Sequence, residues 1–363
     1  MKAAGLRYKG NVDSTLERLR ELYEKRAQDR IFARFEIPSR VLSLYLEKQP
    51  PGFCSYPDPR QRISFWDEYL KERRAIEDDS MPAAYLSELD QGLYGGAAGG
   101  QVQYMRNENG WVSSMVTPIL KDWSEFDSLS FSEANLHYRR YIDQLDVFVQ
   151  GAAGKFGISH FILIDGLNFV FELVGATKTY ESLIGAQRMV RKATAFAFEL
   201  NLRIQNYFFS RVPLFAGGTF SNMAQWIPGR IVSESLDPFH MTSVQYFEHW
   251  GRENIERMLA RFDGGVIHLH GNGRHLLEAA CSIPGVKAIW LGDDRGHPPA
   301  FEVLSQLRKR AADMPLVVSV DYNDFTAKLQ RHRLCGGVCY RVTDTPDADQ
   351  ANRCMEAVLG YRC

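Results

Sequence analysis

The stretch Val266-Ile267-His268-Leu269-His270-Gly271-Asn272-Gly273 decides the fold that this sequence predicts. Its first residues are apolar and β-prone, which indicates a buried strand over 266–269. A Gly-Asn-Gly turn follows directly, and a helical pattern begins at Arg274. A strand, a turn and a helix in this order are typical of parallel α/β folds, in which functional groups collect at the carboxyl ends of the strands.

Two histidines lie at the end of this predicted strand. His268 and His270 are two residues apart, so both imidazoles lie on the same face of the sheet. Such a pair at a strand's carboxyl end can bind a metal ion or an anionic substrate. A single buried, hydrogen-bonded histidine with an incidental neighbour would give the same pattern, so the pair alone leaves both interpretations open.

The alternation of strand and helix continues along the chain. Beyond a helix at 14–28, strands are predicted at 30–37, 161–165, 212–216, 266–268, 286–291, 316–320 and 337–342. The repeated units favour parallel strands with right-handed crossovers. We therefore predict an α/β fold, specifically a (β/α)8 TIM barrel with an N-terminal helical extension and an elaborated first βα segment. An open doubly wound sheet is the alternative, although no G-x-G-x-x-G motif opens a helix after the first strand.

Length and composition set the broad class. We expect residues 1–363 to form a single domain, with 1–28 as the helical extension and 40–130 as an insertion-rich region. The formal net charge of −1 gives no electrostatic reason to expect a nucleic acid or a membrane surface as a partner. No apolar run approaches a transmembrane length, and the first residues lack the apolar core of a signal peptide. We expect a cytoplasmic protein that acts on a small molecule.

The cysteines fit a reducing compartment. Six cysteines in 363 residues do not make a disulfide scaffold. Cys335 and Cys339 are separated by Gly-Gly-Val, a spacing that differs from the common zinc knuckle. Two small buried side chains on a strand are the favoured interpretation of this pair.

Polar residues follow many of the predicted strands, and in a barrel they would surround one pocket. They are Glu36, Asp165, Asn168, Asn222, Trp226, Glu234, Asp237, His268, His270, Asn272, Asp293, Asp294, Asp321 and Arg341. This set is rich in carboxylates and imidazoles and contains no lysine. It suits a divalent metal, or a cationic or hydroxylated substrate, better than a polyanion. Each acid taken alone is more often a helix cap or a solvated loop residue, so the argument depends on their convergence.

A family resemblance rests on several of these stretches. The segment 266–272 with Leu276-Leu277 and 283–289 resembles the uroporphyrinogen decarboxylase superfamily, in its branch near the corrinoid-dependent methyltransferases. The same pattern includes Asp79-Ser80-Met81-Pro82, Trp226-Ile227-Pro228-Gly229, Leu236-Asp237-Pro238 and Cys335-Gly336-Gly337-Val338. The resemblance extends over residues 14–362. It implies a barrel with one deep pocket at the carboxyl ends of the strands, and often a homodimer.

The methyltransferase branch implies a metal site. Its members are similar at an H-x-C motif whose His and Cys bind zinc, with a later Cys as a further ligand. His268 matches the His, His270 replaces the Cys, and Cys339 or Cys335 is the candidate for the later Cys. A His in place of a Cys makes the site harder, which suits an N or O substrate better than a thiol.

The decarboxylase branch fits less well. Uroporphyrinogen decarboxylases are similar in carrying R-Q-A-G-R after the first strand, where the arginines hold substrate carboxylates. Here the segment is Glu36-Ile37-Pro38-Ser39-Arg40, with one arginine and one acid. A carboxylate-rich tetrapyrrole is therefore a poor match, because Arg is the residue that binds carboxylates bidentately.

The leading hypothesis is a one-carbon transferase, most plausibly of methyl, with a corrinoid protein or tetrahydrofolate as the methyl partner. His268, His270, Asp237 and Asp165 are the expected catalytic residues, and Zn2+ or another divalent metal would be held by His268, His270 and Cys339. The expected substrate-binding residues are Glu36, Asn168, Trp226, Glu234, Asn272, Asp293 and Asp321. A metal-free decarboxylase of a small aromatic or pyrrolic acid, and a non-catalytic subunit of a methyltransferase system, stay as alternatives.

Overall fold

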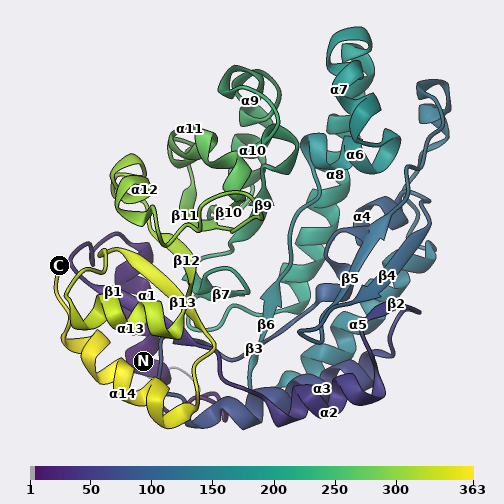
Figure 1. Ribbon diagram of the computed structural model, residues 1–363. Helices are drawn as coiled ribbons and strands as arrows, with labels where there is room; N and C mark the ends of the chain where they lie inside the picture. The colour runs from purple at the N-terminus through teal and green to yellow at the C-terminus, as the bar shows by residue number, and fades with distance from the viewer. Residues whose placement is uncertain (1–4) are drawn as a thin grey trace.

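A sheet of six parallel strands forms one side of the protein, in a computed structural model that describes residues 5–363 (Figure 1). In sheet order the strands are β1 (Ile31–Phe35), β13 (Val338–Thr343), β12 (Leu316–Asp321), β11 (Val286–Leu291), β10 (Gly265–Leu269) and β9 (Val232–Ser235). Their residues are mostly buried and apolar, as expected for parallel strands covered on both faces. This sheet confirms the predicted α/β class with parallel strands.

A second sheet continues the arrangement beyond β9. It contains β3 (Ala83–Tyr85), β6 (Gly157–His160), β7 (Gly218–Ser221) and β8 (Gln225–Pro228). The first three are parallel to one another, whereas β8 returns antiparallel to β7 as a hairpin. A parallel bridge between Ile162 and Ser233 links this sheet to β9.

Two carboxylates connect the other edge of the second sheet to β1. Asp78 Oδ2 accepts a hydrogen bond from the Phe35 amide at 2.7 Å, and Asp79 Oδ2 accepts one from the Ala33 amide at 2.9 Å. Arg18 holds Asp79 through Nε at 2.6 Å and Nη2 at 2.9 Å. The arrangement is compatible with the predicted barrel, but within residues 5–363 no ladder of strand pairs joins β1 to β3, so a closed barrel is not shown.

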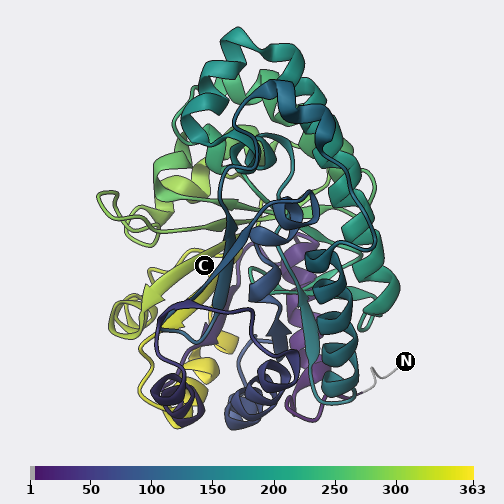
Figure 2. The ribbon, with the colours of Figure 1, turned by 90° about the vertical axis from the view of Figure 1, so that its right-hand side faces the viewer.

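The region 40–130 contains a third, antiparallel sheet. Its strands are β2 (Gly52–Cys54), β4 (Val102–Arg106) and β5 (Val112–Val116), paired in the order β2-β4-β5. Figure 1 places these strands at its right-hand edge, on the side away from β10 to β13, and in Figure 2, where that side faces the viewer, they lie in front. The insertion-rich region thus adds a sheet to the outside of the parallel strands.

Helices cover the outside of the strands (Figure 1). The α-helices are α1 (Val12–Tyr23), α2 (Arg40–Lys48), α3 (Pro59–Glu72), α4 (Gly92–Ala97), α5 (Leu136–Ala152), α6 (Gly166–Val174), α7 (Ala176–Gly185), α8 (Gln187–Arg211), α9 (Val244–Trp250), α10 (Arg252–Leu259), α11 (Leu277–Cys281), α12 (Leu304–Arg310), α13 (Tyr322–Gln330) and α14 (Ala348–Gly360). Short 3-10 helices are η1 (Arg73–Ala75), η2 (Ser87–Leu89), η3 (Trp123–Ser128), η4 (Asp237–Phe239) and η5 (Gly271–Leu276). No helix among these is long and apolar enough to cross a membrane.

Two strand predictions need correction, and one strand of the six-stranded sheet was not predicted. The apolar run 161–165 follows β6 instead of forming the strand, and β9 was not predicted because its Ser-Glu-Ser sequence is polar. The strand expected at 212–216 begins at Gly218, because Ala216 and Gly217 form a turn with φ values of 49° and 79°. The predicted strands at 286–291, 316–320 and 337–342 are confirmed to within one residue at each end.

Candidate functional site

His268 lies on β10 beside Trp290 of β11, its partner in the strand register. The imidazole stacks on the indole, with ring centroids 4.5 Å apart and an interplanar angle of 24°. Gly292 leaves room for this ring, because a Cβ at that position would lie 2.8 Å from His268 Nε2. The stacking on Trp290 and the lack of a side chain at Gly292 together fix the orientation of the His268 ring.

His270 follows β10 and is oriented by Asp294. Its Nδ1 lies 2.8 Å from Asp294 Oδ1, and Asp294 Oδ2 accepts from the Asn272 amide at 3.3 Å. Burial by itself would raise the pKa of Asp294. The hydrogen bonds from His270 and from the backbone outweigh this effect, so the pKa of Asp294 lies below its ordinary value. An ionised Asp294 accepts a hydrogen bond from Nδ1–H, which leaves the Nε2 lone pair of His270 free to bind a metal or substrate.

Asp237 brings a carboxylate to the two histidines from η4, just after β9. Its Oδ1 is buried without a hydrogen-bond partner, 3.6 Å from His270 Nε2 and 3.8 Å from His240 Nδ1. Asp237, His268 and His270 each offer a ligand atom, and these atoms lie within 4.8 Å of one another. Ligands about 2.1 Å from a tetrahedral metal lie about 3.4 Å apart. The donor set and its spacing therefore fit a divalent metal such as Zn2+.

His240 and His268 are neutral at physiological pH. Burial lowers the pKa of each to about 4, and the neighbouring His270 contributes to both shifts. The Nε2 atom of His240 is buried without a partner, and its ring centroid lies 5.3 Å from that of His270. Neutral imidazole is the form that binds metals, so both rings are in a protonation state that can bind one.

A pair of buried acids lies behind the histidines. Burial raises the pKa of Asp165 to about 6, and burial together with the charge of Asp165 raises the pKa of Glu234 well above its usual range. Asn254 Nδ2 donates to Asp165 Oδ2 at 2.6 Å. Glu234 thus keeps its proton at neutral pH and donates a hydrogen bond to Asp165, so the pair holds one proton.

A small cavity opens beside Asp237. Asn168 and Glu172 of α6 line it together with Ser235 and the apolar side chains of Ile162 and Phe171. Asn168 Nδ2 donates to the Ser235 carbonyl at 2.9 Å, which fixes the amide at the cavity wall. Asn168, one of the predicted substrate-binding residues, thus lines the same cavity as Asp237.

Several predicted site residues have structural contacts instead. Asp293 Oδ1 accepts from Arg274 and from the Ala300 amide, and Asp321 caps α13 by accepting from the Asn323 amide. Asp294, one residue after Asp293, makes the histidine contact. Asp321 is therefore found in the ordinary role of an N-cap residue.

Trp226 and Cys339 lie away from the histidine group. Trp226 is fully buried in β8 and donates from Nε1 to the Phe215 carbonyl at 2.8 Å. Cys339 is buried in β13 opposite Phe32, and burial raises the pKa of its thiol to about 12. A protonated, enclosed thiol is a poor metal ligand, and among the described residues it is Asp237 that joins the two histidines.

Two further residues near the site were missed by the sequence reasoning. His240 follows the Leu236-Asp237-Pro238 motif by two residues, so its proximity to Asp237 offered a signal. Asp90 is buried, and its pKa is raised to about 6 by burial and by the charge of Asp237. Nothing in the sequence around Asp90 places it near Asp237, because η2 and η4 lie far apart in the chain.

The comparisons with known proteins give a fold and no family. No protein-family model matches the chain, and no curated protein does. A solved methyltransferase from Methanosarcina mazei has a similar structure, with a TM-score of 0.61 and 11% sequence identity over 95% of this chain and 98% of that chain. At this identity the likeness shows that the two proteins share a fold along almost their whole lengths.

Proposed function

We propose that this protein is a metal-dependent enzyme that transfers a one-carbon unit, namely methyl, and that Asp237, His268 and His270 hold Zn2+ or another divalent metal. The observation that carries the proposal is the buried Oδ1 of Asp237, which lacks a hydrogen-bond partner and faces the Nε2 atom of His270. A buried acceptor without a donor is costly, and a cation would satisfy it.

Methyl transfer is supported by a resemblance in sequence and by a likeness in fold. The sequence resembles the branch of the uroporphyrinogen decarboxylase superfamily near the corrinoid-dependent methyltransferases, and the fold neighbour from Methanosarcina mazei is a methyltransferase. A corrinoid protein or tetrahydrofolate is the methyl partner that the resemblance implies. A cytoplasmic homodimer is the assembly that we expect.

The ligand set points to the type of methyl acceptor. A bound divalent metal would supply Lewis acidity, which lowers the pKa of an acceptor atom. Two imidazoles and a carboxylate are harder ligands than thiolates, so the site suits an N or O acceptor. Asp294 holds His270 in the metal-binding tautomer, and Trp290 covers one face of His268 and excludes water there.

Metal content tests the proposal. Protein purified without a polyhistidine tag and reconstituted with Zn2+ is expected to retain about one metal ion per chain by inductively coupled plasma mass spectrometry. The double variant His268→Ala, His270→Ala is expected to lose it. His249→Ala, an exposed histidine on α9, is the matched control and should retain the metal. Wild-type protein that holds no metal after reconstitution would contradict the proposal.

The buried acid pair favours one alternative, a metal-free decarboxylase of a small aromatic or pyrrolic acid. Loss of CO2 leaves a carbanion that must take up a proton, and Glu234 with Asp165 holds one. Decarboxylation that survives chelation and is lost in Glu234→Gln would favour this alternative over methyl transfer.

A further inference from the structure

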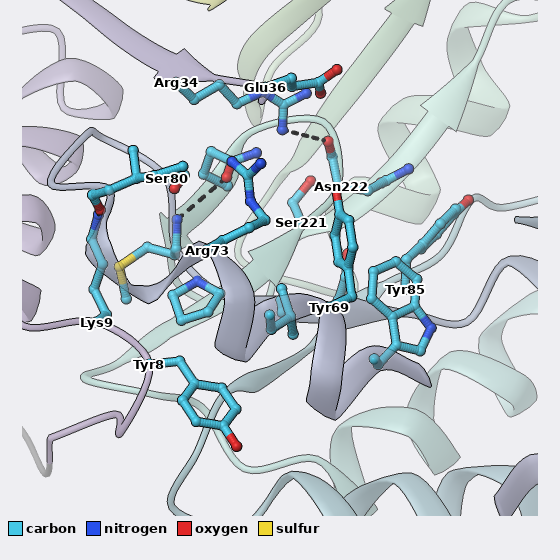
Figure 3. A pocket seen from close by; sticks show the side chains of 18 of the residues that line it. Tyr8, Lys9, Arg34, Glu36, Tyr69, Arg73, Ser80, Tyr85, Ser221 and Asn222 are labelled. Atoms are coloured by element: carbon cyan, nitrogen blue, oxygen red, sulfur yellow. Dashed lines mark hydrogen bonds between the residues drawn. The ribbon is translucent and has the colours of Figure 1, made fainter. Parts of the chain in front are cut away.

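A second cavity lies between α3 and the parallel strands, with walls from α3, β1, β11 and the β7–β8 hairpin (Figure 3). Aromatic side chains form much of its lining, namely Trp66, Tyr69, Tyr85, Trp111 and Trp290. Arg34 and Glu36 lie on one side of the cavity in the close view, and Tyr8 lies on the opposite side. Asp237 and His270 do not line this cavity, so it is distinct from the proposed metal site.

Four polar atoms that belong to residues lining the cavity are buried without a hydrogen-bond partner. Three are donors, Arg34 Nε, Trp66 Nε1 and Trp290 Nε1, and one is an acceptor, Asn222 Oδ1. Folded proteins leave few buried polar atoms unpaired, and each one costs free energy. Three unpaired donors around one space indicate that a ligand with acceptor atoms belongs there.

Arg34 also carries a positive charge without a counter-ion. Its Nη1 donates to the Asn222 carbonyl at 3.3 Å, and within residues 5–363 no carboxylate lies in ion-pair distance of it. The neighbouring guanidinium of Arg341 is committed to Glu36, with contacts of 2.6 and 3.1 Å. Burial and the charge of Arg341 lower the pKa of Arg34, although a guanidinium stays protonated at neutral pH. Two cations that line this cavity, Arg34 and Arg73, thus have no carboxylate in ion-pair distance among residues 5–363, and Arg73 Nη2 donates to the Phe35 carbonyl at 2.6 Å.

We propose that this cavity binds a small aromatic monocarboxylate, with its carboxylate on the Nε edge of Arg34 and its ring among Trp66, Tyr69 and Trp290. A guanidinium binds a carboxylate through parallel hydrogen bonds. The indole N–H groups of Trp66 and Trp290 would donate the remaining hydrogen bonds to the carboxylate oxygens. The aromatic walls offer stacked and edge-to-face contacts to a flat ring. These walls favour an anion that carries a flat ring over inorganic phosphate.

The site is independent of the metal. None of its unpaired atoms belongs to the ligand group Asp237, His268 and His270. Trp290 is the one residue that the cavity and the histidine site have in common, because its indole lines the cavity and stacks on His268. A result on carboxylate binding therefore stands apart from a result on metal content.

Binding of benzoate tests the proposal, measured by calorimetry and by quenching of tryptophan fluorescence in the full chain. Benzoate is expected to bind saturably, with benzamide and inorganic phosphate at least tenfold weaker. Arg34→Met should weaken benzoate about a hundredfold and Trp66→Phe about tenfold, as expected for the loss of a charged and of a single hydrogen-bond donor. Arg188→Met on α8 and Trp123→Phe, whose Nε1 already donates to Ser182, are the matched controls and should bind as wild type does.

Trp66→Phe keeps the proposal testable if Arg34→Met does not fold, because it keeps an aromatic ring in place and removes one unpaired donor. Equal affinity for benzoate and benzamide would overturn the proposal, since the charge would then play no part. Tighter binding of phosphate than of benzoate would overturn it as well, and so would undetectable benzoate binding or wild-type benzoate affinity in both cavity variants.

Discussion

The contact of Asp79 with β1 gives a sharp stability prediction. Asp79 is 1% exposed and Arg18 is 13% exposed, and the carboxylate also accepts from the Ala33 amide. Asp79→Ala removes one partner from a buried pair, leaves a guanidinium without its counter-ion, and leaves an amide of β1 without an acceptor. Breaking a buried pair in this way costs about 3–5 kcal/mol.

The loss can be converted to a melting temperature. Unfolding entropies of about 2.1 cal/mol/K per residue imply that a loss of about 4 kcal/mol lowers Tm by about 5 °C in a chain of 363 residues. Differential scanning calorimetry at pH 7 measures this shift. Asp313→Ala is the control, because its pair with Lys25 is exposed and such pairs contribute about 0.2–1 kcal/mol.

Comparison of the Tm shifts of the two variants tests whether side chains hold β1 in place. If the connection between β1 and the residues before β3 depends on side chains, Asp79→Ala must shift Tm several times further than Asp313→Ala. Equal shifts within about 1 °C would show that Asp79 does not hold β1 in place, and the account of how this edge is joined would be wrong.

Three further predictions concern the histidines. Gly292→Ala places a Cβ 2.8 Å from His268 Nε2, so metal content should fall while far-UV circular dichroism stays that of wild type. Asp294→Asn removes the anion that orients His270 and should weaken Zn2+ binding about 10- to 100-fold in a competition titration; unchanged affinity would contradict that role. Burial lowers the pKa of His160 from 6.5 to about 4, so the unfolded chain takes up this proton first and stability falls as pH drops from 6.5 to 4. The Tm of His160→Gln should fall less steeply over that interval, and parallel curves would refute the assignment.

The strands of the C-terminal half could be predicted because each combines a short apolar run with a turn and a helical pattern. β10 and β11 are such strands, and the sequence predicted both. β9 could not be found in this way, because Glu234 points into the protein and is tolerated there only as a protonated acid beside Asp165. The hairpin β7–β8 was missed because a tight turn before Gly218 shifts the strand away from the apolar run at 212–216.

The candidate site was predictable in part. His268, His270 and Asp237 were named from the sequence, because they lie at strand ends that meet at one edge of a parallel sheet. The role of Asp294 was not predicted. Asp293 and Asp294 are adjacent and chemically identical, so only the direction of each side chain, which the sequence does not give, distinguishes them. Cys339 was expected to be a ligand by analogy, whereas the alternation of side chains along β13 buries it against Phe32.

The pairing of β1 with β13 has a consequence for how the protein is made. Ile31 of β1 lies opposite Val338 of β13. Strand β1 is therefore synthesised early, whereas its neighbour in the sheet is synthesised after nearly all the other strands. Contacts between such distant residues form slowly, and during translation the edge of β1 stays available for mispairing. The sheet should therefore be completed only after β13 has been synthesised, and the folding yield should depend on chaperones that shield nascent strands.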